Sequence, residues 1–136
     1  MDDKTRPKTI LIVDDDQFIT IAYKSGLEQA GYAVMVAQDG EEALQSMLDS
    51  RPDLVLLDII MPKMDGFEVL QSVKGTPSLA DIPIIVFTNL SQKSDADKAR
   101  EYGAIDFLTK ADVSLSDVLL RLERLLNPEF DPNLPR

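Results

Sequence analysis

The sequence predicts an α/β fold, a doubly wound five-stranded parallel sheet covered by five helices. Short apolar runs alternate with helix-like segments through the 136 residues. Most of these runs are continuous rather than alternating, as expected for strands that are buried on both faces. Five such strand–helix units form a sheet with right-handed crossovers, and the strand order 2-1-3-4-5 suits a chain of this size.

Five apolar runs are the predicted strands, and they lie at 9–13, 33–37, 53–57, 83–87 and 104–108. The first helix follows the first strand, because Phe18, Ile21, Ala22 and Ser25 share one helical face. Gly31 stands where a C-terminal cap would end this helix.

Caps and periodicity place the other four helices. Asp39 and Glu42 form a capping-box-like start to the second helix, and Pro52 follows its end. The third is predicted at 66–74, and the fourth at 93–102, before Gly103. The second and fifth have apolar residues at helical spacing, which are Ala43, Leu44, Met47 and Leu48 in the second and Leu115, Val118, Leu119, Leu122, Leu125 and Leu126 in the fifth.

One domain accounts for the periodic part of the chain. We expect an N-terminal extension at 1–7, a single domain at 8–127 and a tail at 128–136. The last ten residues contain three prolines and no periodicity, so we expect an extended tail that packs on the domain or begins a linker.

Composition excludes several classes of function. A net charge of −10 disfavours nucleic acid and anionic membranes as partners. The absence of Cys and His excludes thiol nucleophiles, Ser-His catalysis and zinc sites built from those ligands. Neither a signal peptide nor a membrane span of about 18 apolar residues is present in the sequence, so a cytoplasmic protein is expected.

Polar residues gather where the predicted strands end. The carboxyl ends of parallel strands meet at one edge of such a sheet, and ligands bind there. The residues that the sequence brings to this edge are Asp14, Asp15, Asp16, Asp58, Thr88, Asn89 and Lys110. Asp58 follows a buried run, and we expect it to end that strand at an exposed tip.

Clustered carboxylates at this edge need a counter-charge. Two of them about 4 Å apart repel by roughly 4 kcal/mol at an effective dielectric near 20. Oxygen ligands without His or Cys favour Mg²⁺. Structural readings stay open for single residues: the run Asp14–Asp16 fits a solvated turn that caps the first helix, and Lys110 fits an ordinary solvated lysine.

The motifs at this edge resemble those of the response-regulator receiver domain, over about residues 8–127. ILIVDD at 10–15 is similar to the acidic pair of that family, and DIIMPKMDG at 58–66 is similar to its D-x-x-M-P-x-M-D-G loop. FT at 87–88 and FLTK at 107–110 stand at matching spacings. The resemblance implies the flavodoxin-like, CheY-like fold of single-domain chemotaxis regulators.

The resemblance also implies roles for the site residues. Asp58 would accept a phosphoryl group from a phosphohistidine of a sensor histidine kinase or phosphotransfer protein. Asp15, Asp58 and the backbone carbonyl of Ile60 would bind Mg²⁺ directly, and Asp14 would act through a metal-bound water. Lys110 would pair with the phosphoryl group.

The same resemblance implies a signalling switch rather than an enzyme. The hydroxyl of Thr88 would move towards the phosphoryl group and Phe107 would turn inward, which biases two pre-existing states. The fourth helix, fifth strand and fifth helix would then signal to a partner protein. The protein would be a monomer or a dimer linked to phosphorylation.

Three departures from the family pattern are visible. Ala111 replaces the proline that usually follows the lysine, so this peptide bond is expected to be trans or the loop differently shaped. Asn89 replaces the small residue that usually follows the switch threonine in this family. Ile60 and Leu90 stand at positions that tune hydrolysis of the phosphoaspartate, and we expect them to slow it.

Two other functions fit parts of the sequence. Asp14-x-Asp16 after the first strand also resembles the haloacid-dehalogenase phosphatases, in which Asp14 would be the nucleophile. A receiver fold that works as an unphosphorylated interaction module is the second alternative. The D-x-x-M-P-x-M-D-G loop argues against the phosphatase, and the complete set of site residues argues against the unphosphorylated module.

Overall fold

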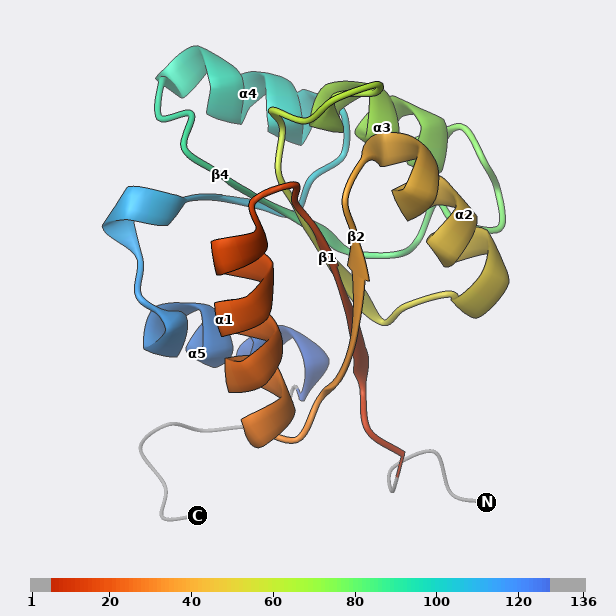
Figure 1. Ribbon diagram of the computed structural model, residues 1–136. Coiled ribbons are helices and arrows are strands. Elements are labelled where there is room, and N and C mark those ends of the chain that lie inside the picture. The colour runs from red at the N-terminus through yellow and green to blue at the C-terminus, as the bar shows by residue number, and fades with distance from the viewer. Residues whose placement is uncertain (1–5, 128–136) are drawn as a thin grey trace.

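The computed structural model describes residues 6–127 and confirms the doubly wound fold (Figure 1). Five parallel strands lie in the order β2-β1-β3-β4-β5. The strands are β1 (Thr9–Val13), β2 (Ala33–Ala37), β3 (Leu54–Leu57), β4 (Ile84–Thr88) and β5 (Asp106–Thr109). The helices are α1 (Gln17–Gln29), α2 (Gly40–Ser50), α3 (Gly66–Lys74), α4 (Lys93–Glu101) and α5 (Leu115–Leu126), and a short 3₁₀ helix, η2 (Lys110–Asp112), follows β5.

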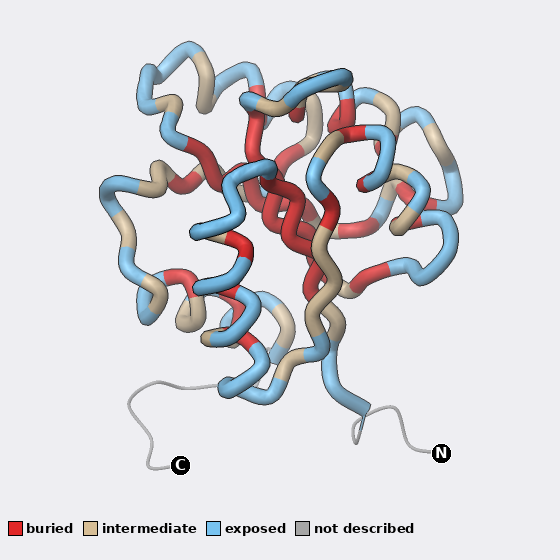
Figure 2. Tube along the Cα trace, viewed as in Figure 1, coloured by how far each residue is buried: buried red, intermediate tan, exposed pale blue. Residues whose placement is uncertain are grey.

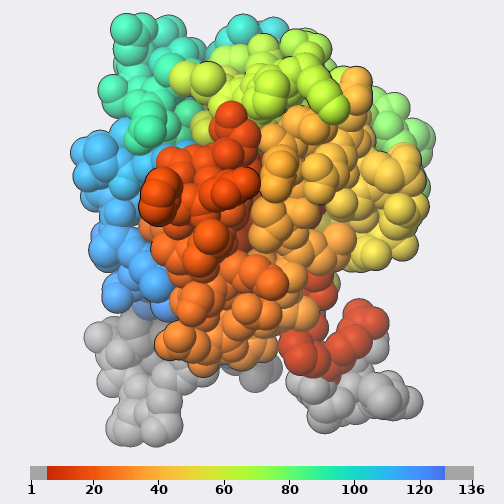
Figure 3. Space-filling view, in the orientation of Figure 1, coloured from red at the N-terminus to blue at the C-terminus, as the bar shows by residue number. Residues whose placement is uncertain are grey.

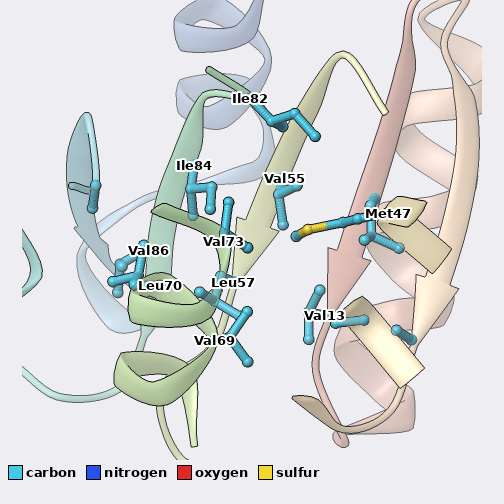
Figure 4. Packing of buried hydrophobic residues seen from close by; sticks show 14 of the residues in the cluster. Val13, Met47, Val55, Leu57, Val69, Leu70, Val73, Ile82, Ile84 and Val86 are labelled. Carbon is cyan, nitrogen blue, oxygen red and sulfur yellow. The ribbon is translucent and has the colours of Figure 1, made fainter. Parts of the chain in front are cut away.

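The sheet separates two hydrophobic cores. Helices α2, α3 and α4 cover one face, where Met47 and Val73 pack against Val55 (Figure 4). Helices α1 and α5 cover the other face, where Leu27 and Leu122 pack with sheet residues such as those of β3. The central strands are buried on both sides, as Figure 2 shows, which explains their continuous apolar runs.

Edge strands and strand starts depart from the predicted pattern. β2 lies at the sheet edge, and four of its five residues are not fully buried. The third strand begins at Leu54 rather than at 53, and the Asp53 carboxylate accepts the Thr9 N–H at 2.7 Å. The fourth begins after Pro83, which has no N–H to donate, and the fifth begins at 106 rather than 104.

Helix α1 is apolar on two faces. The residues that indicated the helix, Phe18 and Ile21, are 88% and 69% exposed, whereas Tyr23 and Leu27 are buried against the sheet. Both sets have helical spacing, so periodicity identifies the helix without choosing its inner face. The outer surface of α1 faces the viewer in Figure 3.

The predicted caps are present. The Asp39 carboxylate accepts the Glu42 N–H at 2.9 Å, at the start of α2. Gly31 and Gly103 follow α1 and α4 with φ of 102° and 105°, a conformation that favours glycine. The tail expected at 128–136 and most of the N-terminal extension lie outside the described residues. Within the described part, no helix combines the length and apolarity that crossing a membrane requires.

Gly66→Ala is expected to destabilise the fold. A Cβ at Gly66 would lie 2.8 Å from the Ile59 Cα and still closer to the carbonyl oxygen of Asp58. Backbone atoms cannot move aside easily, so we expect urea unfolding to give a loss of about 1–3 kcal/mol in the free energy of unfolding.

Gly75→Ala is the matched control for that substitution. Gly75 has right-handed helical angles, and a Cβ there would meet the Gln71 carbonyl at 3.3 Å. Its effect should stay within about 0.5 kcal/mol. Equal effects of the two substitutions would contradict the packing argument for Gly66.

Candidate functional site

Three carboxylates meet at the carboxyl edge of the sheet, as the sequence predicts. Asp14 follows β1, Asp58 follows β3 and Asp15 lies beside them, with ligand atoms all within 4.8 Å of one another. Asp14 and Asp58 are buried, with 2% and 7% of their surfaces exposed, and Asp15 is exposed. The expectation that Asp58 ends its strand at an exposed tip is therefore wrong.

The backbone explains why these acids are held in place. The Asp58 N–H donates to the Val13 carbonyl at 2.9 Å, and the Asp14 N–H donates to the Ala37 carbonyl at 3.0 Å. Both residues thus continue the sheet ladder by one step. One oxygen of Asp14 also accepts the Asp16 N–H at 2.9 Å.

Lys110 lies between the two buried acids. Its Nζ is 2.5 Å from Oδ2 of Asp14 and 3.1 Å from Oδ2 of Asp58, and its side chain is only 8% exposed. The sequence had left a solvated lysine open, and the structure excludes it. η2 begins at Lys110, and no cis peptide occurs in residues 6–127, so the bond to Ala111 is trans, one of the two outcomes expected.

Burial dominates the electrostatics of this cluster. It raises the pKa of Asp14, although hydrogen bonds from Lys110 and the Asp16 N–H oppose the rise. Burial also lowers the pKa of Lys110, but its hydrogen bond to Asp14 and the charges of Asp58 and Asp14 more than offset this, so the pKa is raised. One ammonium neutralises only one of three carboxylates, which leaves room for a further cation.

A shallow hollow of about 210 Å³ opens over the cluster. Thr88 is fully buried in its wall, and its Oγ1 accepts the Leu90 N–H at 3.4 Å. The Ile60 side chain is 60% exposed at the rim. The residues that line the hollow are Asp15, Asp16, Asp58, Ile60, Thr88, Asn89 and Lys110.

Asp16 caps α1, which agrees with the helix-capping role that the sequence left open for the run Asp14–Asp16. Its carboxylate accepts the N–H groups of Phe18 at 2.9 Å and Ile19 at 3.4 Å. These bonds commit Asp16 to the helix N-terminus, which weakens the phosphatase reading of Asp14-x-Asp16.

Phe107 and Thr109 connect β5 to the neighbouring elements. Phe107 is partly buried and packs against the core on the α2–α4 face. The Thr109 hydroxyl donates to the Leu90 carbonyl at 3.4 Å, which holds the loop after β4. Sequence reasoning missed Thr109, because an ordinary strand threonine carries no signal for this contact.

Comparison with known proteins gives a consistent result. A family model described as the response regulator receiver domain matches residues 10–122. Response regulator MprA of Mycobacterium sp. (strain KMS) is 38% identical over 132 residues, which make up 95% of this chain and 56% of that protein. The chain thus spans about half the length of the curated relatives it matches.

Solved structures agree with the family match. The chemotaxis protein CheY4 of Vibrio cholerae has a TM-score of 0.81 and 30% identity, covering 88% of this chain and 98% of that one. The Mn(2+)-bound form of response regulator Rcp1 has a TM-score of 0.79 and 28% identity, covering 96% of this chain and all of that one. This chain therefore belongs to the CheY-like response-regulator receiver domains of two-component systems.

Proposed function

We propose that this receiver domain takes a phosphoryl group onto Asp58 from a phosphohistidine of a sensor histidine kinase or phosphotransfer protein. The observation that carries the proposal is the buried Asp58 carboxylate at the base of an open hollow, 3.1 Å from Lys110. None of the 136 residues is a histidine, so the donor histidine lies outside this sequence. An Asp58 oxygen forms the bond to phosphorus as the phosphorus–nitrogen bond breaks, and the imidazole leaves with the electron pair.

The residues present fit Mg²⁺. Asp14, Asp15 and Asp58 supply hard oxygen ligands. Burial raises the pKa of Asp14 among them. They would hold the ion together with the Ile60 carbonyl, and Asp14 would act through a bound water. The ion would neutralise charge on the transferring phosphoryl group. The similar response regulator Rcp1 has a Mn(2+)-bound form, which supports the proposal that this fold binds a divalent cation.

The switch in this proposal begins with two side chains. Lys110 leaves Asp14 to pair with a phosphoryl oxygen, and the Thr88 hydroxyl donates to another. Movement of Thr88 pulls on Leu90 through their present contact, and Phe107 turns inward. The surface of α4, β5 and α5 changes as a result and signals to a partner protein.

This role makes the protein a signalling switch that assists its own phosphorylation and dephosphorylation, not a separate enzyme. We propose a cytoplasmic location and a protein partner downstream. A net charge of −10 disfavours direct contact of this chain with nucleic acid or an anionic membrane. It would act as a monomer or as a dimer linked to phosphorylation.

Incubation with acetyl phosphate tests the proposed function. With Mg²⁺ present, intact mass spectrometry should detect the addition of one phosphoryl group, and EDTA should prevent it. If no group is added with Mg²⁺, or if the gain is equal in EDTA, the chain is an unphosphorylated interaction module instead.

Ile60→Asn is expected to shorten the lifetime of the phosphoaspartate. The exposed Ile60 side chain stands at the rim of the hollow, where it limits the approach of water to Asp58. A polar amide should position that water, so we expect decay to speed up about tenfold, equal to about 1.4 kcal/mol of barrier. Loss of the phosphoryl mass over time measures this, with Ile60→Leu as the apolar control. An unchanged decay rate would refute the shielding role.

Phe18→Ser is expected to slow phosphorylation by a protein donor but not phosphorylation by a small-molecule donor. Phe18 is 88% exposed and stands two residues after Asp16, which lines the hollow, so a donor protein that reaches Asp58 would cover it. Loss of its burial should slow transfer from a phosphohistidine protein about tenfold. Transfer from acetyl phosphate should not change, and Phe18→Leu should retain most of the protein-donor rate. Equal slowing with both donors would place the effect in the site itself.

A further inference from the structure

The loop between β4 and α4, at 89–92, is held at one residue by hydroxyl groups from two strands (Figure 1). The Leu90 N–H donates to Oγ1 of Thr88 at 3.4 Å, and the Leu90 carbonyl accepts from Oγ1 of Thr109 at 3.4 Å. Thr88 and Thr109 are also partners in the register of β4 and β5. The last paired residues of these two strands therefore hold both backbone polar groups of Leu90.

The other residues of this loop are open to solvent. Asn89, Ser91 and Gln92 are exposed, and Gln92, the N-cap residue of α4, makes no side-chain hydrogen bond to the helix. The Leu90 side chain is partly buried and packs against the core on the α2–α4 face. The contacts at Leu90 thus anchor a loop whose remaining residues are exposed.

Phosphorylation of Asp58 would act on the two hydroxyl groups differently. Thr88 lines the hollow over Asp58, so a phosphoryl group there would offer its hydroxyl a charged acceptor, whereas Thr109 is not one of the lining residues. A hydrogen bond to a charged oxygen is about twice as strong as one between neutral groups. A contact of 3.4 Å is also longer than the usual range of about 2.7–3.2 Å. The pull on Thr88 is therefore stronger than the contact that Thr109 makes with Leu90.

We propose that the Thr109 hydroxyl is a latch that holds the β4–α4 loop in its unphosphorylated position. The inference rests on the proposed function, because it concerns the movement that phosphorylation of Asp58 would start. Thr88 draws Leu90 along only if the Leu90 carbonyl leaves the Thr109 hydroxyl. Thr109 is thus a positioning residue that lowers the population of the active arrangement without touching the phosphoryl group.

The strength of one hydrogen bond sets the size of the effect. A single neutral hydrogen bond changes an equilibrium about two- to tenfold, and a contact of 3.4 Å belongs at the lower end of that range. Removal of the hydroxyl should therefore make the active arrangement about threefold more populated. If the domain reacts from that arrangement, phosphorylation speeds up in the same proportion.

Thr109→Val tests the latch in the full chain, because valine keeps the branched shape and removes the hydroxyl. Before any phosphodonor is added, we expect amide hydrogen exchange at Leu90 to be about threefold faster than in the wild type. Phosphorylation by acetyl phosphate and Mg²⁺, followed by intact mass, should also be about threefold faster. Thr109→Ser keeps the hydroxyl and should restore both rates.

Thr76→Val is the matched control for the loss of a threonine hydroxyl. The Thr76 hydroxyl donates to the Ser72 carbonyl at 2.8 Å, at the C-terminal end of α3. Its removal deletes a bond of the same kind, and one that is shorter, outside the β4–α4 loop. Exchange at Leu90 and the rate of phosphorylation should both stay at the wild-type values.

Two results in Thr109→Val would overturn the proposal. Unchanged exchange at Leu90 would mean that the hydroxyl does not hold the loop. Phosphorylation at or below the wild-type rate would mean that the contact is purely structural or that it supports the active arrangement. The proposed function fails separately: if the wild type gains no phosphoryl group, Asp58 is not an acceptor, and exchange at Leu90 then decides on the latch alone.

Discussion

Asp58→Asn is expected to abolish phosphorylation by acetyl phosphate and Mg²⁺. The substitution keeps the size of the side chain and removes the oxygen nucleophile, at a position that is 7% exposed. Asp14 is the nearest rival acceptor, but it is more deeply buried, and Lys110 lies only 2.5 Å from it. No other carboxylate of the cluster is both next to Lys110 and part of the hollow's lining.

Intact mass spectrometry with and without Mg²⁺ measures this loss, and Asp16→Asn is the matched control. Asp16 lines the same hollow but caps α1 through its Oδ1, a role that asparagine also fills. The control should gain a phosphoryl group at nearly the wild-type rate. A Mg²⁺-dependent mass gain in Asp58→Asn at that rate would mean that another residue is the acceptor.

Lys110→Met is expected to cause a large loss of stability in EDTA and a much smaller one in Mg²⁺. The substitution leaves Asp14 and Asp58 buried without their common counter-charge. Removing one partner of a buried ion pair costs about 3–5 kcal/mol. Mg²⁺ should replace the missing charge, and at about 100 times its dissociation constant it would return about 2.7 kcal/mol.

Urea unfolding with EDTA or Mg²⁺ measures this effect. Lys93→Met is the control, because the ion pair of Lys93 with Asp97 is exposed and such pairs contribute about 0–1 kcal/mol. A loss in Lys110→Met no larger than that of the control, or one that Mg²⁺ leaves unchanged, would contradict the account of the buried cluster.

The stability deficit of Lys110→Met should also grow with pH. Burial raises the pKa of Asp14, so the folded form binds this proton more tightly than the unfolded chain does. The stability that the proton provides is present below the unfolded pKa and is lost as the pH rises through the folded pKa. Without the ammonium of Lys110 the folded pKa rises further, so the deficit should widen between acidic and neutral pH.

The sheet was predictable because its strands are buried on both faces. Continuous apolar runs such as β3 and β4 have few alternative structures, and the strand order follows from their alternation with helices. Helix α1 was harder, because Phe18 and Ile21 form a second apolar face opposite Tyr23 and Leu27. Only the contacts with the sheet decide which face is buried.

The candidate site was predictable as a set of residues and less so as an arrangement. The rule that parallel strands end at one edge brings Asp14, Asp58 and Lys110 together from distant parts of the sequence. It says nothing of their depth, and the burial of Asp58 went against expectation. The contact of Thr109 with Leu90 depends on loop conformation, which neither periodicity nor motif spacing records.

Peptide mapping after reaction with acetyl phosphate and Mg²⁺ tests the central claim most directly. The account predicts one phosphoryl group, located on Asp58 within residues 54–62, and none when EDTA removes the divalent ion. A label on Asp14, or a label on Asp58 that forms equally well in EDTA, would contradict it.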